Sequence, residues 1–165
     1  MKDAEFERLV SRHAQDVYGF LVYRTGDPHL AEEILADTLE RAYRARTRFN
    51  RGRASEKTWL ITIALNRWRD VVRRERSERA AIERLGGGHE EAAWDTDAVD
   101  ERRALLAALA SLPADEREVI TLTYGADLAA KQVAQVLGMP VTTVQGRLYR
   151  GLKRLRETIG VEQSS

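Results

Sequence analysis

Apolar side chains recur every three or four positions in the N-terminal part of the chain, a spacing typical of amphipathic helices. In residues 3–25 the repeat consists of Phe6, Leu9, Val10, Val17, Phe20 and Leu21. Gly26 follows as a natural helix end, and Asp27 is placed to cap a second helix whose first turn contains Pro28. The apolar stripe of that second helix consists of Ile34, Leu35, Thr38, Leu39, Ala42 and Tyr43.

A polar, arginine-rich segment at residues 48–54 interrupts the repeat and predicts a basic loop. Ser55 then stands at the N-cap position of a long third helix that runs to about Arg84. Beyond it, residues 85–100 contain three successive glycines and many acidic residues without a steady period, which predicts a flexible acidic linker. Trp94 within this segment is either a docking anchor or a side chain that packs onto a neighbouring helix, and we favour packing.

Helical spacing returns at Asp100, and Pro113 separates the two helices that it predicts. A short helix then ends at Gly138, and a turn at Met139-Pro140 leads to a second amphipathic helix from Val141. This order is the pattern of a helix-turn-helix.

The sequence thus predicts an all-α fold, since no strand pattern occurs anywhere in it. Two helical domains, residues 1–84 and 102–160, are joined by the acidic linker at residues 85–101, and the C-terminal domain contains the helix-turn-helix.

Composition excludes several classes of protein. The chain has 165 residues, of which 43% are hydrophobic, enough for a packed core. It contains no cysteine, which excludes a disulfide framework and a thiolate zinc site. No apolar run approaches the ~18 residues that span a bilayer, and the polar N-terminus lacks a signal core. We therefore expect a cytoplasmic protein without membrane insertion.

Charge is unevenly distributed behind a net value of +1. Residues 40–84 carry fourteen bases and six acids, a net +8, whereas residues 85–112 carry two bases and six acids, a net −4. Five further bases lie between Arg147 and Arg156. Two basic regions separated by an acidic one indicate two contacts with one long polyanion, although solvated helix faces would give a similar pattern.

One face of the third helix has an unusual composition. At 3.6 residues per turn, the side opposite Leu60 carries Trp59, Thr62, Asn66, Arg69 and Arg73. A ring that can stack, neutral groups that can read base edges and arginines that can hold phosphates suit unstacked nucleic acid. Trp59 as an ordinary core residue is the alternative.

The last helix divides in the same way. Its apolar stripe consists of Val144, Leu148, Leu152 and Leu155, and the opposite side carries Thr142, Gln145, Gly146, Tyr149, Arg150 and Lys153. A recognition helix places its N-terminal residues against base edges and its basic residues against phosphates. Gly146 costs roughly 1 kcal/mol relative to alanine inside a helix. Close approach to DNA or close packing against another helix would each explain it.

Signals for an enzyme are weak. The three histidines, His13, His29 and His89, are scattered, and no metal-ligand spacing appears. His13 falls on the buried stripe of the first helix and is best explained as a core or interface residue. We expect no catalytic residue, no metal and no cofactor.

Several stretches in a fixed order carry a family likeness: residues 25–43, Arg48-Phe49, residues 59–74, Leu112-Pro113, residues 116–119 and residues 133–151. The chain resembles an extracytoplasmic-function (ECF) sigma factor of bacterial RNA polymerase over nearly its whole length. It departs from the family pattern at Glu56, where an aromatic residue is common, and at Gln135, which replaces a common acidic residue.

The resemblance implies a specificity subunit that binds core RNA polymerase, captures single-stranded bases of the −10 element, reads the duplex −35 element and promotes promoter melting. Polymerase contacts are then expected from Glu33, Asp37, Thr38 and Arg41. Contacts to the −10 strand are expected from Phe49, Asn50, Arg51, Arg53, Trp59, Thr62, Asn66, Arg69 and Arg73. Contacts to the −35 duplex are expected from Thr142, Thr143, Gln145, Gly146, Arg147, Tyr149, Arg150 and Lys153. Such proteins are often held inactive by an anti-sigma factor, and the sequence identifies none.

Two other classes remain open. The first is a helix-turn-helix regulator with an N-terminal helical dimerisation or effector domain. The basic face that runs from Trp59 to Arg73 argues against it, because a dimerisation domain does not need such a face. The second is a small helical enzyme, which would need a converging ionisable cluster that the sequence does not show.

Overall fold

The structure is a computed structural model that describes residues 1–85 and 100–163. Every regular element in these two ranges is helical, which confirms the predicted all-α class. The elements are α1 (Asp3–Thr25), α2 (Pro28–Arg44), η1 (Arg46–Arg48), α3 (Glu56–Arg84), α4 (Asp100–Ala110), α5 (Ala114–Ile120), η2 (Thr121–Gly125), α6 (Ala130–Leu137) and α7 (Val141–Gln163). His89, Trp94 and most of the linker predicted at residues 85–101 fall on residues 86–99, outside the described residues. The predicted end of the linker is wrong, because α4 already begins at Asp100.

The predicted helix ends are confirmed by their hydrogen bonds. The Asp27 carboxylate accepts from the backbone N–H groups of His29 and Leu30 at 3.0 and 3.3 Å, and so caps α2. The Ser55 hydroxyl accepts from the N–H of Thr58 at 3.1 Å and caps α3. Gly138, with φ at +67°, ends α6 in the left-handed region that glycine tolerates best.

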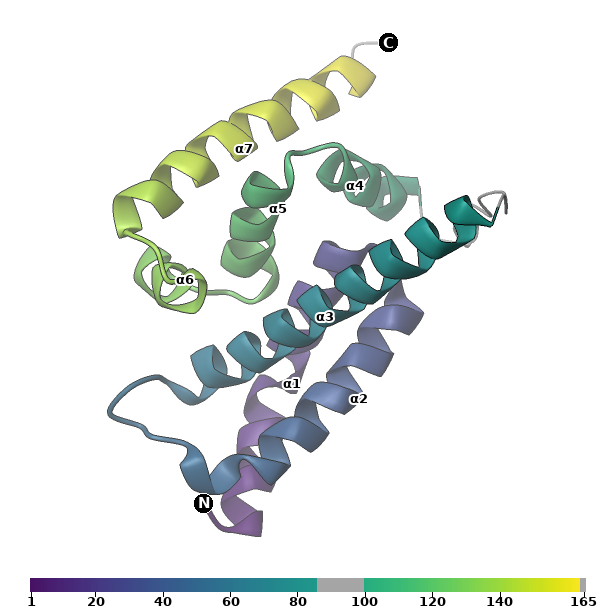
Figure 1. Cartoon of the computed structure of the whole chain (residues 1–165). Helices are drawn as coiled ribbons and strands as arrows, with labels where there is room; N and C mark the ends of the chain where they lie inside the picture. The colour runs from purple at the N-terminus through teal and green to yellow at the C-terminus, as the bar shows by residue number, and fades with distance from the viewer. Residues whose placement is uncertain (86–99, 164–165) are drawn as a thin grey trace.

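The N-terminal half consists of α1, α2 and α3, which lie alongside one another below α4–α7 in Figure 1. Val17, Phe20 and Leu21 of α1 are completely buried, as are Leu60 and Ile61 of α3. These helices therefore pack through the apolar stripes that the sequence predicts.

The C-terminal half builds the helix-turn-helix on α5. Gly138 and the turn after it join α6 to α7, and α5 continues into the π-helical turn η2. Leu109, Leu112 and Ile120 form a small second cluster, against which Leu148, Leu152 and Leu155 of α7 pack. The buried stripe predicted for the last helix is thus confirmed.

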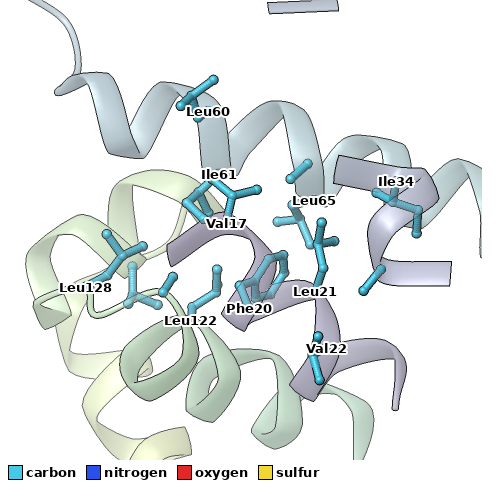
Figure 2. Close-up of a cluster of buried hydrophobic side chains, with 14 of the residues drawn as sticks. Val17, Phe20, Leu21, Val22, Ile34, Leu60, Ile61, Leu65, Leu122 and Leu128 are labelled. Atoms are coloured by element: carbon cyan, nitrogen blue, oxygen red, sulfur yellow. The ribbon is translucent and has the colours of Figure 1, made fainter. Parts of the chain in front are cut away.

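The two halves share one hydrophobic core. Leu122 and Leu128, which flank the end of η2, join Val17 and Phe20 of α1 and Ile61 of α3 (Figure 2). The helices also approach closely: a Cβ atom on Gly19 of α1 would lie 2.7 Å from the carbonyl oxygen of Gly125 in η2. The two stretches predicted as separate domains therefore pack as one body. The reason is that apolar side chains of α1 contact both the N-terminal half and the C-terminal half.

Candidate nucleic-acid interface

The loop between α2 and α3 is folded against the start of α3. The Phe49 ring lies 4.8 Å from the Trp59 ring, centroid to centroid, and both side chains are half-buried. Asn50 accepts a hydrogen bond of 2.9 Å from the N–H of Gly52, which closes a tight turn. Trp59 therefore contributes to the edge of the core and also presents an aromatic surface beside the basic loop.

Glu56 connects this loop to α1. Its carboxylate forms ion pairs with Arg12 of α1 at 3.3 Å and with Arg51 of the loop at 3.5 Å, and it lies 3.3 Å from Nε2 of His13 in α1. The Glu56 side chain is only 20% exposed, so these contacts are partly shielded from water. Glu56 departs from the family pattern, but no feature of the sequence predicts that it would position the loop.

The basic face of α3 is partly free and partly occupied. Asn66 is exposed, and Arg73 is 76% exposed with a contact of 3.5 Å to Asp70. Thr62 uses its hydroxyl to donate to the carbonyl of Thr58 at 2.8 Å. Arg69 reaches the other half of the molecule, where its Nη2 lies 3.4 Å from a carboxylate oxygen of Glu118 in α5. The free part of the face therefore centres on Asn66 and Arg73.

The outer face of α7 is open to solvent at most of the predicted positions. Tyr149 is 71% exposed although it is large and apolar. Its exposed neighbours on the helix are Thr142, Gln145, Arg150 and Lys153, and Thr143 is half-buried. Exposed aromatic and basic side chains on one face of a recognition helix are what contact with a DNA duplex requires.

Arg147 differs from the other predicted contacts on α7. Its side chain is 28% exposed, its Nε lies 3.7 Å from a carboxylate oxygen of Asp115, and its Nη1 lies 3.7 Å from the sulfur of Met139. The guanidinium therefore braces the helix-turn-helix against α5. The role of Arg147 as a phosphate contact stays a prediction, and the contact with Asp115 would compete with it.

Gly146 does not lie at a helix contact. A Cβ atom there would meet only the end of the Arg150 side chain of the same helix, at 3.2 Å. Close packing against another helix, one of the two explanations considered for this glycine, is therefore wrong. The other explanation, close approach of DNA to the helix, stays a prediction.

The positions on α2 that the resemblance assigned to polymerase differ in accessibility. Glu33 is exposed, and Arg41 donates to Asp37 at 3.2 Å on the helix surface. Asp37 also forms a close ion pair with the half-buried Arg67 of α3, so it holds α2 and α3 together. Thr38 is completely buried and donates its hydroxyl to the carbonyl of Ile34 at 2.7 Å. The expectation of a polymerase contact at Thr38 is wrong for this reason, since no partner can reach it.

Two family models cover most of the chain. The model for Sigma-70 region 2 matches residues 9–78, and the model for Sigma-70, region 4 matches residues 102–155. The RNA polymerase sigma factor CarQ of Myxococcus xanthus is 33% identical over 94% of this chain and 89% of its own length. The ECF RNA polymerase sigma factor SigM of Bacillus subtilis (strain 168) is 29% identical over 91% of this chain and 92% of its own length. This chain belongs to the ECF sigma factor family.

A solved structure agrees with this assignment. The sigma factor RpoE in complex with the anti-sigma factor NepR, from Bartonella quintana, superposes with a TM-score of 0.79 and 25% identity, covering 95% of this chain and 98% of that one. The protein is thus a promoter-specificity subunit of RNA polymerase. The alternative of a regulator with an N-terminal dimerisation domain is excluded, because the N-terminal half matches region 2.

Within the described residues of this ECF sigma factor, no three His, Asp or Glu side chains come together in a way that could hold a metal ion. None of the helices described there is long and apolar enough to cross a membrane.

A group of arginines lies at the boundary of the two halves and is not predicted by the sequence. Arg24 of α1 lies over the Trp68 ring, 5.5 Å from its centroid, and has no carboxylate partner among the described contacts. Burial, with the nearby charges of Arg117 and Arg69, lowers the pKa of Arg24 to about 10, and Glu118 opposes this shift. Burial also lowers the pKa of Arg117. No local pattern reveals this cluster, because its members come from α1, α3 and α5.

Proposed function

We propose that this sigma factor captures the single-stranded −10 element on α3 and the preceding loop. The observation that carries the proposal is the exposed pair of Asn66 and Arg73 on the same helix as the Trp59–Phe49 aromatic pair. Aromatic rings stack on unpaired bases, an amide hydrogen-bonds their edges, and arginines hold phosphates. Arg51 and Arg53 of the loop add exposed positive charge beside this surface.

The −35 duplex would bind the outer face of α7. Thr142, Thr143 and Gln145 lie in its first turns, where a recognition helix reaches base edges, and Arg150 and Lys153 lie further along to meet phosphates. Chain segments 1–84 and 102–160 would then each serve one promoter element.

Core polymerase would bind the outer surface of α2 through Glu33, Asp37 and Arg41. The ion pair between Asp37 and Arg67 keeps this surface in place on α3. Since its partner would be bacterial RNA polymerase, the protein would act in the cytoplasm, and it would contribute no chemistry of its own. An anti-sigma factor is a further expected partner, because the RpoE structure similar to this chain is a complex with one.

Asn66→Ala tests the assignment of α3 to strand capture. With added core polymerase, the variant should bind a double-stranded promoter nearly as well as the wild type but form fewer open complexes. Permanganate reactivity of thymines in the −10 region measures opening directly. Arg150→Ala is the matched control, since it should weaken duplex binding instead. Unchanged permanganate reactivity with Asn66→Ala would refute the role of this residue.

A further inference from the structure

The basic loop, residues 49–54, is anchored at its start by the first turn of α1 (Figure 1). Just before the loop, Nη2 of Arg46 lies 3.5 Å from a carboxylate oxygen of Asp3, and Cζ of Arg46 lies 3.8 Å from the centroid of the Tyr43 ring. The Tyr43 hydroxyl donates to the same Asp3 oxygen at 3.2 Å. These contacts hold the end of α2 and the start of the loop on α1.

Glu56 anchors the other end of the loop. Its Oε2 lies 3.3 Å from Nη1 of Arg12 in α1 and 3.3 Å from Nε2 of His13. Its Oε1 lies 3.5 Å from Nη2 of Arg51 in the loop. Because one oxygen faces α1 and the other faces the loop, a single carboxylate bridges the two.

A hollow beside this carboxylate gathers positive charge. Arg8 and Arg12 of α1 line it together with Arg51 of the loop, and the carboxylates in its lining are Glu5 and Glu56. The Glu56 side chain is 20% exposed, whereas those of Arg12 and Arg51 are 64% and 70% exposed. Isolated surface ion pairs contribute little to stability, but a shielded carboxylate that serves several cations contributes more. Without the Glu56 charge, repulsion from Arg8 and Arg12 would favour movement of Arg51 away from α1.

Contacts within the loop shape it but do not orient it. The N–H groups of Gly52 and Arg53 donate to the side-chain and backbone oxygens of Asn50 at 2.9 and 3.0 Å. Outside the loop, the aromatic pair at the start of α3 holds one side of it, and Gln135 of α6 donates to the carbonyl of Arg53. The Arg51 side chain is directed by Glu56, and at 70% exposure it can still reach a phosphate.

We propose that Glu56 is a positioning residue for the −10 element: it orients the basic loop by joining Arg51 to α1, and this orientation sets how strictly the sigma factor selects its −10 sequence. The inference rests on the proposed −10 surface and deepens it. Glu56 stands where an aromatic residue is common in the family, so the family pattern does not imply this ionic anchor. A loop that is oriented only part of the time binds more weakly, in proportion to the oriented fraction. A loop that can shift also accommodates a wrong base.

The test compares Glu56→Gln with Asp16→Asn. The Asp16 carboxylate lies 3.2 Å from Nζ of Lys57, so this matched control also removes an ion pair between α1 and the start of α3, but one that does not include the loop. Amide hydrogen exchange of the full chain without polymerase, followed by NMR, measures the order of the loop at Gly52 and Arg53. We expect exchange to accelerate by roughly threefold or more in Glu56→Gln, because local opening becomes easier, and to keep its wild-type rate in Asp16→Asn. Unchanged exchange in Glu56→Gln would overturn the positioning role.

Promoter opening by the holoenzyme measures the consequence, on a promoter found by run-off transcription with the wild type. Glu56→Gln should reduce permanganate reactivity in the −10 region by roughly fivefold, if about one loop in five is oriented without the anchor. It should also reduce discrimination between that promoter and its single-base −10 variants, whereas discrimination among −35 variants should stay unchanged. A general loss of structure would lower opening without changing relative preference. An equal loss at every −10 sequence would therefore overturn the proposal.

Arg12→Gln is a second variant, on α1, that leaves the Glu56 charge in place. It should change loop exchange and −10 discrimination in the same direction as Glu56→Gln but by less, because His13 still contacts Glu56. In the Glu56→Gln background it should add nothing, since the bridge is already broken. Additive losses in the double variant would show that the two residues act independently and would overturn the bridge.

Loop order and promoter opening can fail separately. Unchanged exchange in Glu56→Gln overturns the role of Glu56 and leaves the proposed −10 surface standing. Faster exchange without any change in opening or in −10 discrimination would overturn the place of the loop in that surface, and this proposal with it.

Discussion

The buried carboxylate of Glu116 in α5 accepts a hydrogen bond of 2.9 Å from Nε of Arg154 in α7. The Glu116 side chain is 5% exposed, whereas that of Arg154 is 58% exposed. The ion pair therefore links α7, the long helix that carries the proposed −35 surface, to α5. Its carboxylate is buried, whereas its guanidinium is largely exposed to water. Removing the two partners should have different consequences for stability.

Arg154→Met should lower the free energy of unfolding by about 2 kcal/mol, because it leaves a buried carboxylate without its cation. Urea denaturation followed by helical circular dichroism measures the loss. Arg156→Met, at an exposed position two residues further along α7, is the control and should stay within about 0.5 kcal/mol of the wild type. Equal losses in both variants would show that the ion pair contributes nothing specific.

Two glycines of α7 should respond oppositely to alanine. A Cβ atom on Gly151 would lie 2.7 Å from Cδ1 of Ile120 and 3.2 Å from Cβ of Glu116, so Gly151→Ala should destabilise by about 1–2 kcal/mol despite its better helix propensity. Gly146→Ala should instead stabilise by up to about 1 kcal/mol, since only the flexible end of Arg150 lies nearby.

The same pair of variants examines the DNA surface. If Gly146 lets a duplex approach the helix, Gly146→Ala should weaken promoter binding by the polymerase holoenzyme while it raises the melting temperature of the free protein. Thermal unfolding gives the melting temperature, and a filter-binding titration of the holoenzyme made with the same preparation gives the promoter affinity. A Gly146→Ala protein that is more stable and binds the promoter equally well would show that this glycine has no role in recognition.

Arg24→Met should raise the free energy of unfolding at pH 7 by on the order of 1 kcal/mol. The folded chain holds the Arg24 pKa at about 10, below the ordinary value of an arginine, so it carries the charged side chain at a cost at neutral pH. Loss of the cation–π contact with Trp68 offsets part of the gain.

The difference in stability between Arg24→Met and the wild type should change with pH in a direction that can be checked. Above about pH 10 the folded wild type releases a proton that the unfolded chain still binds, so the cost of Arg24 declines as the pH rises above its folded-state pKa. The advantage of Arg24→Met in urea denaturation should therefore be smaller near pH 10.5 than at pH 7. Arg73→Met, at a position 76% exposed, should show no gain at either pH.

Arg150→Ala and Gln145→Ala separate affinity from specificity on α7. Removal of a phosphate contact should weaken binding across many −35 sequences and reduce the slope of log K against log salt by about 1. Gln145→Ala should instead relax preference at one −35 position, because an amide reads a base edge. Holoenzyme binding to a promoter library at several salt concentrations distinguishes the two. A uniform loss in both variants would contradict the assignment of Gln145 to base reading.

The sequence by itself determined the helices, their ends and much of their buried faces. Periodicity is a local property: Asp27 and Ser55 cap the helices that they precede, and Gly138 ends α6 in a left-handed turn. The order of these elements also carried the family resemblance that the comparisons show. Exposure of Asn66 and Tyr149 followed from the same helical geometry, because both lie opposite apolar stripes.

Only the tertiary structure decided which polar groups are free. Thr38 lies on the same helix as Asp37 and Arg41, but its side chain is buried in the core. Arg147 lies on the outer part of α7 but forms an ion pair with a carboxylate of α5. Above all, Glu118 and Arg69 are 49 residues apart, and nothing in the periodicity of either helix indicates that they meet. Burial and charge pairing between distant segments depend on which helix faces pack against each other. The sequence pattern determines which face of each helix is apolar, but it does not determine which other helix that face contacts.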